Sequence, residues 1–268
     1  MKPHTRFLAS LIVLCASTVS AQEAPDPGRE SKIDEGVLVI SGRPGYARAE
    51  EFSIYKRPDG GFTVISNITA DDDSYTATGA WNYDAKWRAL SAEGQSTVKG
   101  VTRKLEIRRE GGPEGVTVRL VRKTTSKSGD LKIDTYNAPC DMNCLMDLTP
   151  GALPMAVMPR RYDSAKGGEQ AFKWVGISYT DDQVLLDGTA TLWLNRTQKV
   201  SGVGDVSHWR FREDLPGPKP GETYQMNSHL WTDATLKLRK FGIGRTSKPG
   251  TIGIRETDDK LSSQMPAE

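Results

Sequence analysis

The sequence predicts an all-β fold, a large antiparallel meander that forms a strongly curved, incomplete barrel around a short inserted non-β segment. Two observations favour this fold. Runs of β-branched and aromatic residues alternate with polar residues at a period of two, and Gly, Pro and Asp separate the runs. Helix signals are sparse, because Pro150, Pro154 and Pro159 limit any helix near them to a turn or two. A two-sheet β-sandwich is the alternative.

The N-terminal residues have the composition of a cleaved signal peptide. Lys2 and Arg6 precede an apolar run at 7–16, and a stretch of small residues ends at Ala21. The run is too short to span a bilayer, and no later run reaches the length of a transmembrane helix. We therefore expect export to the periplasm and no transmembrane segment in the mature chain.

The mature chain is expected to be neutral, because removing Lys2 and Arg6 leaves equal numbers of basic and acidic residues. Long-range attraction to nucleic acid is therefore not expected. The predicted organisation is a signal peptide at 1–21, a flexible leader at 22–34, a single β domain at 35–256 with an insertion at 140–168, and a polar tail at 257–268.

The expected strands are short and follow one another along the whole domain. They are the alternating runs at 52–56, 62–66, 75–81, 104–110, 116–123, 131–136, 172–179, 189–195, 207–213, 224–230 and 235–241.

The turn residues predict how neighbouring strands pair. Asp59 and Gly60 suit a two-residue type I′ turn, which pairs Ile54 with Ile65 and places bulky apolar groups on both faces of the hairpin.

The proline-rich loop at 215–222 predicts a second hairpin. It pairs Phe211 with Met226 and puts Trp209 and Leu230 on one dry face, with polar residues on the other.

The two cysteines of the mature chain, Cys140 and Cys144, favour a disulfide in an exported protein. Closing so small a loop stabilises the fold by about 2 kcal/mol. Met142, Met146, Met155 and Met158 with two free thiols would instead suit Cu(I), but a disulfide removes the thiolates. We predict the disulfide and no metal or cofactor.

Histidine and serine give no catalytic motif. The second hairpin places His208 opposite His229, where they could chelate a metal, but no third ligand flanks them. Exposed surface histidines are therefore expected. Neither Gly-x-Ser-x-Gly nor His-Glu-x-x-His occurs. A hydrolase acting on a glycan or ester is kept as an alternative, which would require acidic residues and tryptophans to converge in one cleft.

Large apolar side chains are the candidate ligand contacts, because binding sites for acyl chains and sugar rings are lined by such groups. The candidates are Met155, Met158, Trp174, Trp193, Trp209, Phe211 and Met226.

Four stretches carry a resemblance: DLTPGALPMAVMPRRYD (147–163), FKWVGISY (172–179), GTATLWLNRTQKVSG (188–202) and VSHWRFRE (206–213). In this order they resemble periplasmic proteins of the lipoprotein-carrier-like and putative glycolipid-binding β-spiral families. The resemblance implies a curved sheet around an inserted segment, with a hydrophobic concavity for an acyl or glycolipid group, or a structural role in envelope integrity.

We therefore expect a periplasmic, non-catalytic protein that binds an amphipathic envelope molecule, namely a lipid, lipoprotein or glycolipid, in its concave face. The alternative is an interaction protein whose sheet edge pairs with another envelope protein.

Overall fold

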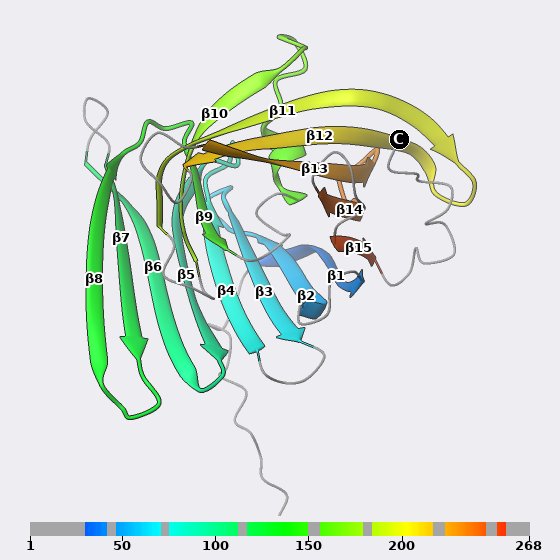
Figure 1. Cartoon of the computed structure of the whole chain (residues 1–268). Coiled ribbons are helices and arrows are strands. Elements are labelled where there is room, and N and C mark those ends of the chain that lie inside the picture. The colour runs from blue at the N-terminus through cyan, green and yellow to red at the C-terminus, as the bar shows by residue number, and fades with distance from the viewer. Residues whose placement is uncertain are drawn as a thin grey trace, which may run out of the picture.

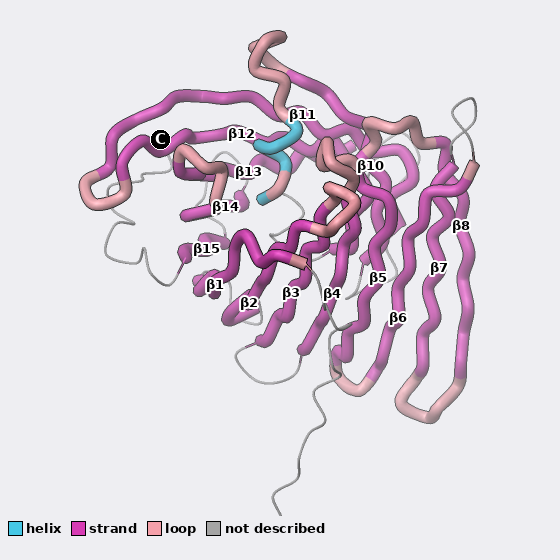
Figure 2. The backbone as a smooth tube through the Cα atoms, turned by 180° about the vertical axis from the view of Figure 1, so that it is seen from behind, coloured by secondary structure: helices cyan, strands magenta, loops and turns pink. Residues whose placement is uncertain are grey.

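The computed structural model describes residues 30–41, 47–70, 75–111, 117–149, 156–178, 184–216, 223–244 and 251–255, and these are almost entirely β (Figures 1 and 2). The first eight strands are β1 (Ser31–Ser41), β2 (Ala47–Lys56), β3 (Phe62–Ala70), β4 (Tyr75–Tyr83), β5 (Ala89–Val98), β6 (Val101–Glu110), β7 (Thr117–Thr125) and β8 (Leu131–Pro139). After them come β9 (Leu145–Thr149), the 3-10 helix η1 (Met158–Arg161), β10 (Gln170–Ser178), β11 (Val184–Val200), β12 (Gly204–Pro216), β13 (Thr223–Asp233), β14 (Leu238–Gly244) and β15 (Thr251–Arg255).

The described strands all belong to one 15-stranded sheet. β1 to β8 form one antiparallel meander, and β10 to β15 form a second. The two meanders join where β1 pairs with β15, so these strands lie in the middle of the sheet. β8 and β9 are its two edges, and β9 is the one strand of this set that pairs in parallel, with β10.

The sheet curls back on itself. In Figure 1 the yellow to brown strands β11–β14 arch over the blue and cyan strands β1–β4. β9 pairs with β10 and also contacts β5 and β6, which belong to the other half of the sheet. An edge of one half therefore touches the face of the other. The strongly curved, incomplete barrel predicted from the alternation is confirmed.

The turn between β2 and β3 is one residue longer than predicted. The Arg57 N–H donates to the Gly61 carbonyl (2.8 Å), and the Gly60 N–H donates to the Arg57 carbonyl (3.0 Å). Gly60 has φ +83°. The loop is thus a type I turn, for which Pro58 is pre-set, followed by a left-handed glycine, and the predicted type I′ turn is wrong.

This extra residue changes which face of the hairpin is buried. Ile54 pairs with Val64 instead of Ile65, and both paired side chains are buried. Because a shift of one residue exchanges the two faces of a strand, the hairpin has one buried face rather than two apolar ones.

The hairpin between β12 and β13 is shifted by two residues. Phe211 pairs with Ser228 rather than with Met226, because β12 continues to Pro216 and pairs it with Thr223. A shift of two residues leaves each side chain on the same face. The predicted dry face is therefore correct, although the predicted partners are wrong.

The inside of the curved sheet is filled by protein side chains. Among the largest fully buried side chains, those of the main apolar core are Leu38, Trp81, Ile107, Leu120, Leu148, Ile177, Leu192 and Phe241. The segment 140–168, expected to be non-β, contributes β9 and η1, and its residues 150–155 lie outside the described residues. β1 begins at Ser31, inside the range 22–34 that was expected to be a flexible leader. Among the described residues, no helix is long and apolar enough to cross a membrane.

Candidate functional site

β9 enters the core beside the predicted disulfide. Cys140 and Cys144 are bonded, both are buried, and their Cα atoms lie 5.4 Å apart. Arg109 on β6 donates hydrogen bonds to the Asp141 carbonyl inside this small loop and to the Ala89 carbonyl on β5 (3.1 Å). The disulfide and Arg109 thus fix the point where the chain leaves the edge strand β8 and enters the interior.

Two hairpin turns near η1 hold a strained backbone conformation. The turns Asp84–Arg88 and Asp233–Lys237 have the same three-residue form as Arg57–Gly61. Their left-handed positions are occupied by Trp87 (φ 60°) and Leu236 (φ 61°) instead of glycine. A side chain in this conformation costs about 1 kcal/mol or more, so packing has to offset the strain.

Packing around Trp87 supplies this compensation and places η1. The Trp87 ring stacks on Phe62 with centroids 3.9 Å apart. The guanidinium of Arg160, from η1, lies 4.9 Å from the centre of the Trp87 ring and donates to the Thr235 carbonyl (3.2 Å). One side chain of η1 therefore connects both strained turns.

A small cavity of about 20 Å³ lies between β9, η1 and the strands around them. Its apolar wall includes Leu145, Met146, Met158, Trp174 and Phe211. This volume holds about one water molecule, so the hollow expected for an acyl chain is filled by the protein's own segment.

Two carboxyl groups line this apolar cavity. Asp147 and Glu213 are almost fully buried, and their Oδ1 and Oε2 atoms have no hydrogen-bond partner among the described residues. Burial raises the pKa of Asp147 to about 7; the Leu148 N–H opposes this rise, and the Glu50 charge adds to it. Burial and the Asp147 charge raise the pKa of Glu213 well above its usual value. Burial of Glu213 therefore favours the neutral form of its carboxyl group.

Close backbone packing holds Asp147 in place. Gly176 on β10 pairs with Asp147 across the parallel ladder. A Cβ atom at Gly176 would lie 3.2 Å from the Asp147 carbonyl and 3.5 Å from Trp174 Nε1. Only glycine allows β9 to approach this closely without a shift of its neighbours.

Arg161 links the cavity to a second, larger cleft. It lines the cavity with Tyr83, and burial lowers its pKa to about 10. Its Nη2 donates to the Asn143 carbonyl (2.6 Å), its guanidinium lies 4.9 Å from the centre of the Phe172 ring, and its Nη1 has no partner.

The second cleft is open, polar and cationic. It has a volume of about 260 Å³ and is lined by Lys86, Arg88, Asn143, Arg161 and Phe172. Three of these five residues are basic, which makes the cleft attractive to an anion.

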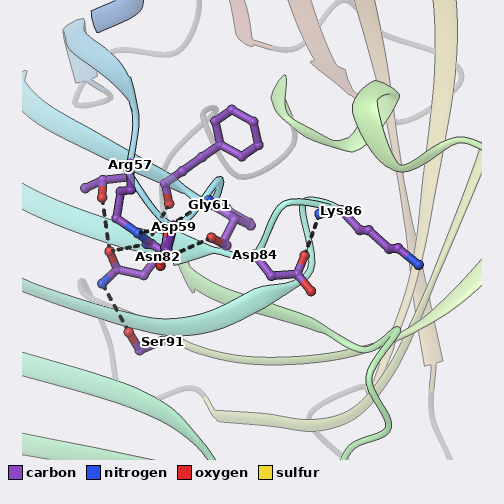
Figure 3. A network of polar contacts seen from close by, with 10 residues as sticks. Arg57, Asp59, Gly61, Asn82, Asp84, Lys86 and Ser91 are labelled. Carbon is purple, nitrogen blue, oxygen red and sulfur yellow. Dashed lines mark hydrogen bonds and ion pairs between the residues drawn. The ribbon is translucent and has the colours of Figure 1, made fainter. Parts of the chain in front are cut away.

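The strained turn Asp84–Arg88 presents two of these cations. The Asp84 carboxylate accepts the backbone N–H groups of Lys86 (2.8 Å) and Arg88 (2.9 Å) and the Arg88 side chain (2.6 Å). Figure 3 shows the bond to Lys86, whose side chain extends away from the polar network. The turn is held further by Arg57, which donates to the Tyr83 carbonyl (3.1 Å).

The predicted ligand contacts are divided between two faces. Met158, Trp174 and Phe211 line the cavity together. Trp209 is buried on the same face of β12 as Phe211 and packs edge-on against Tyr162.

The remaining predicted contacts lie away from the cavity lining. Trp193 pairs with Arg210 on the opposite face of the sheet. Met226 is half-buried opposite Glu213 and does not line the cavity. Met155 lies outside the described residues.

The histidine pair is a packed cluster, not an exposed one. His208 pairs with Trp231, not with His229, and its ring stacks on Trp231 at 4.6 Å. Its Nε2 lies 2.9 Å from His229 Nδ1, and Asn195 Nδ2 lies 3.1 Å from its Nδ1. Burial and then the His229 charge lower the pKa of His208 to about 3. The expectation of surface exposure is wrong for His208, because the Trp231 ring covers it. No group of three or more potential metal ligands occurs among the described residues.

Sequence reasoning missed Asp147, Glu213, Lys86, Arg88 and Arg161. Glu213 had a usable signal, because it continues the inward series of Trp209 and Phe211 on β12 at a period of two.

Comparisons with known proteins give likenesses to solved structures and no family. No family model matches the sequence, and no curated protein matches it either. Among solved structures, the chain is similar to a DUF1089 family protein from Pseudomonas aeruginosa, with 13% identity and a TM-score of 0.38 over 74% of this chain and 90% of that chain. It is also similar to a beta-barrel-like protein of the domain of unknown function DUF1849 from Brucella abortus, with 9% identity and a TM-score of 0.45 over 82% of this chain and 94% of that chain.

Proposed function

We propose that the protein is exported to the periplasm and binds an anionic amphipathic molecule of the cell envelope at the cationic cleft. The observation that carries the proposal is the lining of the cationic cleft, where the apolar ring of Phe172 lies beside Lys86, Arg88 and Arg161. An amphipathic ligand needs both environments side by side.

In this proposal the head group of the ligand lies among Lys86, Arg88 and Arg161, and its first apolar atoms lie against Phe172. A cavity of about 20 Å³ does not accept an acyl chain, so the chain lies along the mouth of the cleft, outside the filled interior. The proposed ligand is therefore a lipid or glycolipid with an acidic head group rather than a neutral one.

The proposed export rests on the N-terminal sequence and on the disulfide. The segment 1–21 has the order of a signal peptide. Cys140 and Cys144 form a disulfide, which persists in oxidising compartments such as the periplasm.

Calorimetric titration with short-chain lipids tests the binding. Dihexanoyl phosphatidylglycerol, which is anionic, is expected to bind at least about tenfold more tightly than dihexanoyl phosphatidylcholine, which is zwitterionic. Lys86→Glu is expected to remove this preference. Lys199→Glu is the matched control, because it makes the same charge change near the far end of β11. Equal binding of both lipids, or none, would contradict the proposal.

One observation favours a second candidate function, a hydrolase. Asp147 and Glu213 line the same cavity as Trp174, which is the convergence of acids and tryptophan that an enzyme acting on a glycan or ester requires. Turnover of p-nitrophenyl esters or glycosides, lost by about a hundredfold or more in Asp147→Asn and Glu213→Gln, is the expected result for this candidate. Absence of turnover by the unaltered protein removes it.

A further inference from the structure

We propose that the edge strand β8 pairs with β8 of a second copy of this chain, in antiparallel orientation about a twofold axis at Ile133. The proposal is independent of the ligand-binding function. It starts from the position of β8, which is an edge of the sheet and pairs only with β7 within the described residues. In Figure 1, β8 lies at the outer left side of the molecule.

β8 presents apolar side chains to solvent on one face. Leu131 is 62% exposed and Ile133 is 57% exposed, and they belong to the few large apolar side chains that are exposed among the described residues. Soluble proteins usually protect an edge strand with a charge, a proline or a covering segment. Here the apolar pair lies directly on the open edge, which indicates a partner.

The turn before β8 determines which backbone groups point outward. The Ser126 N–H donates to the Asp130 carbonyl (2.9 Å), so this pair is hydrogen-bonded. Pairs along an antiparallel ladder alternate between bonded and non-bonded, so the residues at 132, 134 and 136 direct their N–H and C=O groups toward β7. Leu131, Ile133, Thr135 and Asn137 direct theirs to the free edge.

Charges on β8 select one register for self-pairing. With Ile133 opposite Ile133 of the second copy, Lys132 is opposite Asp134 in both directions, and Leu131 is opposite Thr135. Moving the twofold axis by one residue, to 132 or to 134, places Lys132 opposite Lys132 or Asp134 opposite Asp134. Like charges in direct opposition are destabilising. A single charge normally blocks edge pairing, but Lys132 and Asp134 make this edge self-complementary.

The proposed register also satisfies the backbone. Ile133 pairs with its own copy, and Leu131 pairs with Thr135 twice; each of these pairs joins outward-pointing groups and forms hydrogen bonds, about six in total. Leu131 and Ile133 of both copies come together as one apolar cluster. The contact is small, so we expect a weak dimer that forms at high micromolar concentration.

Sedimentation equilibrium of residues 22–268, the chain without the proposed signal peptide, tests the association. Between about 5 and 500 µM the weight-average mass is expected to rise toward that of a dimer. Lys132→Glu is expected to weaken association by about tenfold or more, because a glutamate then opposes Asp134. Lys199→Glu, on β11 in the other half of the sheet, makes the same charge change and is expected to leave association unchanged. A chain that stays monomeric at every concentration overturns the proposal. Pairing of β8 with a strand of another protein would then be the alternative.

Cysteine cross-linking tests the register. Ile133→Cys is expected to form a dimer rapidly on oxidation, because directly opposite Cα atoms lie about 5.5 Å apart, within the range of a disulfide. Thr135 is also exposed and lies on the same face, but the two copies of a Thr135→Cys variant would place this residue about 14 Å apart and are not expected to cross-link. Equal rates for the two variants would show random collision and overturn the twofold register.

Discussion

The guanidinium of Arg160 lies over the ring of Trp87, 4.9 Å from its centre, and its Nη1 donates a hydrogen bond to the Thr235 carbonyl. Trp87 and Thr235 belong to two turns that lie far apart in the sequence. Each turn holds a non-glycine residue in the strained, left-handed backbone conformation. Arg160 is therefore the contact through which η1 holds the two turns together across the candidate site.

Arg160→Ala is expected to destabilise the fold by about 1 to 2 kcal/mol, because it removes a partly desolvated cation–π contact and a hydrogen bond to a carbonyl. Urea unfolding followed by tryptophan fluorescence measures the change. Arg119→Ala is the control: its side chain is half exposed on β7, and its loss is expected to change the free energy of unfolding by less than about 0.5 kcal/mol. Equal effects of the two substitutions would contradict this role of Arg160.

Asp147→Asn is expected to change how stability depends on pH. The pKa of Asp147 is about 7 in the folded protein and 3.8 without its environment, so the folded state holds the extra proton between these values. The resulting stabilisation is complete below pH 3.8 and is lost as pH rises to 7. Asparagine cannot ionise. The variant should therefore match the unaltered protein near pH 4 and exceed its stability at pH 8 by about 2 to 4 kcal/mol. Urea midpoints at both pH values check this, and a constant difference between the proteins would refute it.

His208 is expected to remain neutral far below the usual range of histidine. Its pKa is about 3 when folded and 6.5 when free, so the unfolded state binds the extra proton as pH falls through 6.5. At pH 5 this costs the fold about 2 kcal/mol. NMR spectra should show no shift of the His208 ring signals between pH 8 and pH 5. His208→Gln should lose less stability over the same interval than the unaltered protein. Titration of the ring near pH 6 would show that Trp231 does not cover it.

Cys140→Ala combined with Cys144→Ala is expected to lower the free energy of unfolding by about 2 kcal/mol, the chain-entropy value for so small a loop. Limited proteolysis should then cut near β9 first, because the hydrogen bonds from Arg109 and Arg161 would have to hold that end of the strand without the disulfide. Treatment of the unaltered protein with dithiothreitol is expected to reproduce both effects. An unchanged midpoint and cleavage pattern would show that Arg109 and Arg161 are sufficient to hold β9.

The alternation of apolar and polar residues predicted the class of fold and its curvature, because a period of two is independent of the exact turn. Pairing was less predictable. Pro58 and Gly60 support either a two-residue or a three-residue loop, and the extra residue exchanged the faces of the hairpin. Phe211 kept its predicted face because its shift was an even number of residues.

The candidate site was predictable only in its apolar part. Met158, Trp174 and Phe211 have the character of cavity-lining residues in the sequence itself, and they do line the cavity. Asp147 gave no signal, because its environment is created by β9 packing against β5, a contact between the two halves of the sheet. Lys86 could not be distinguished from other surface lysines without the strained turn that presents it.

The pairing of β1 with β15 determines the order in which the molecule can be completed. During synthesis, which starts at the N-terminus, the strands of the first meander are available early. β1 has no second neighbour until the residues of β15 have been made. The seam that closes last is therefore at the centre of the sheet rather than at its rim. Loss of the five residues Thr251–Arg255 would leave β1 and β14 without a neighbour in the middle of the sheet, and unpaired strand edges are prone to pair with other chains.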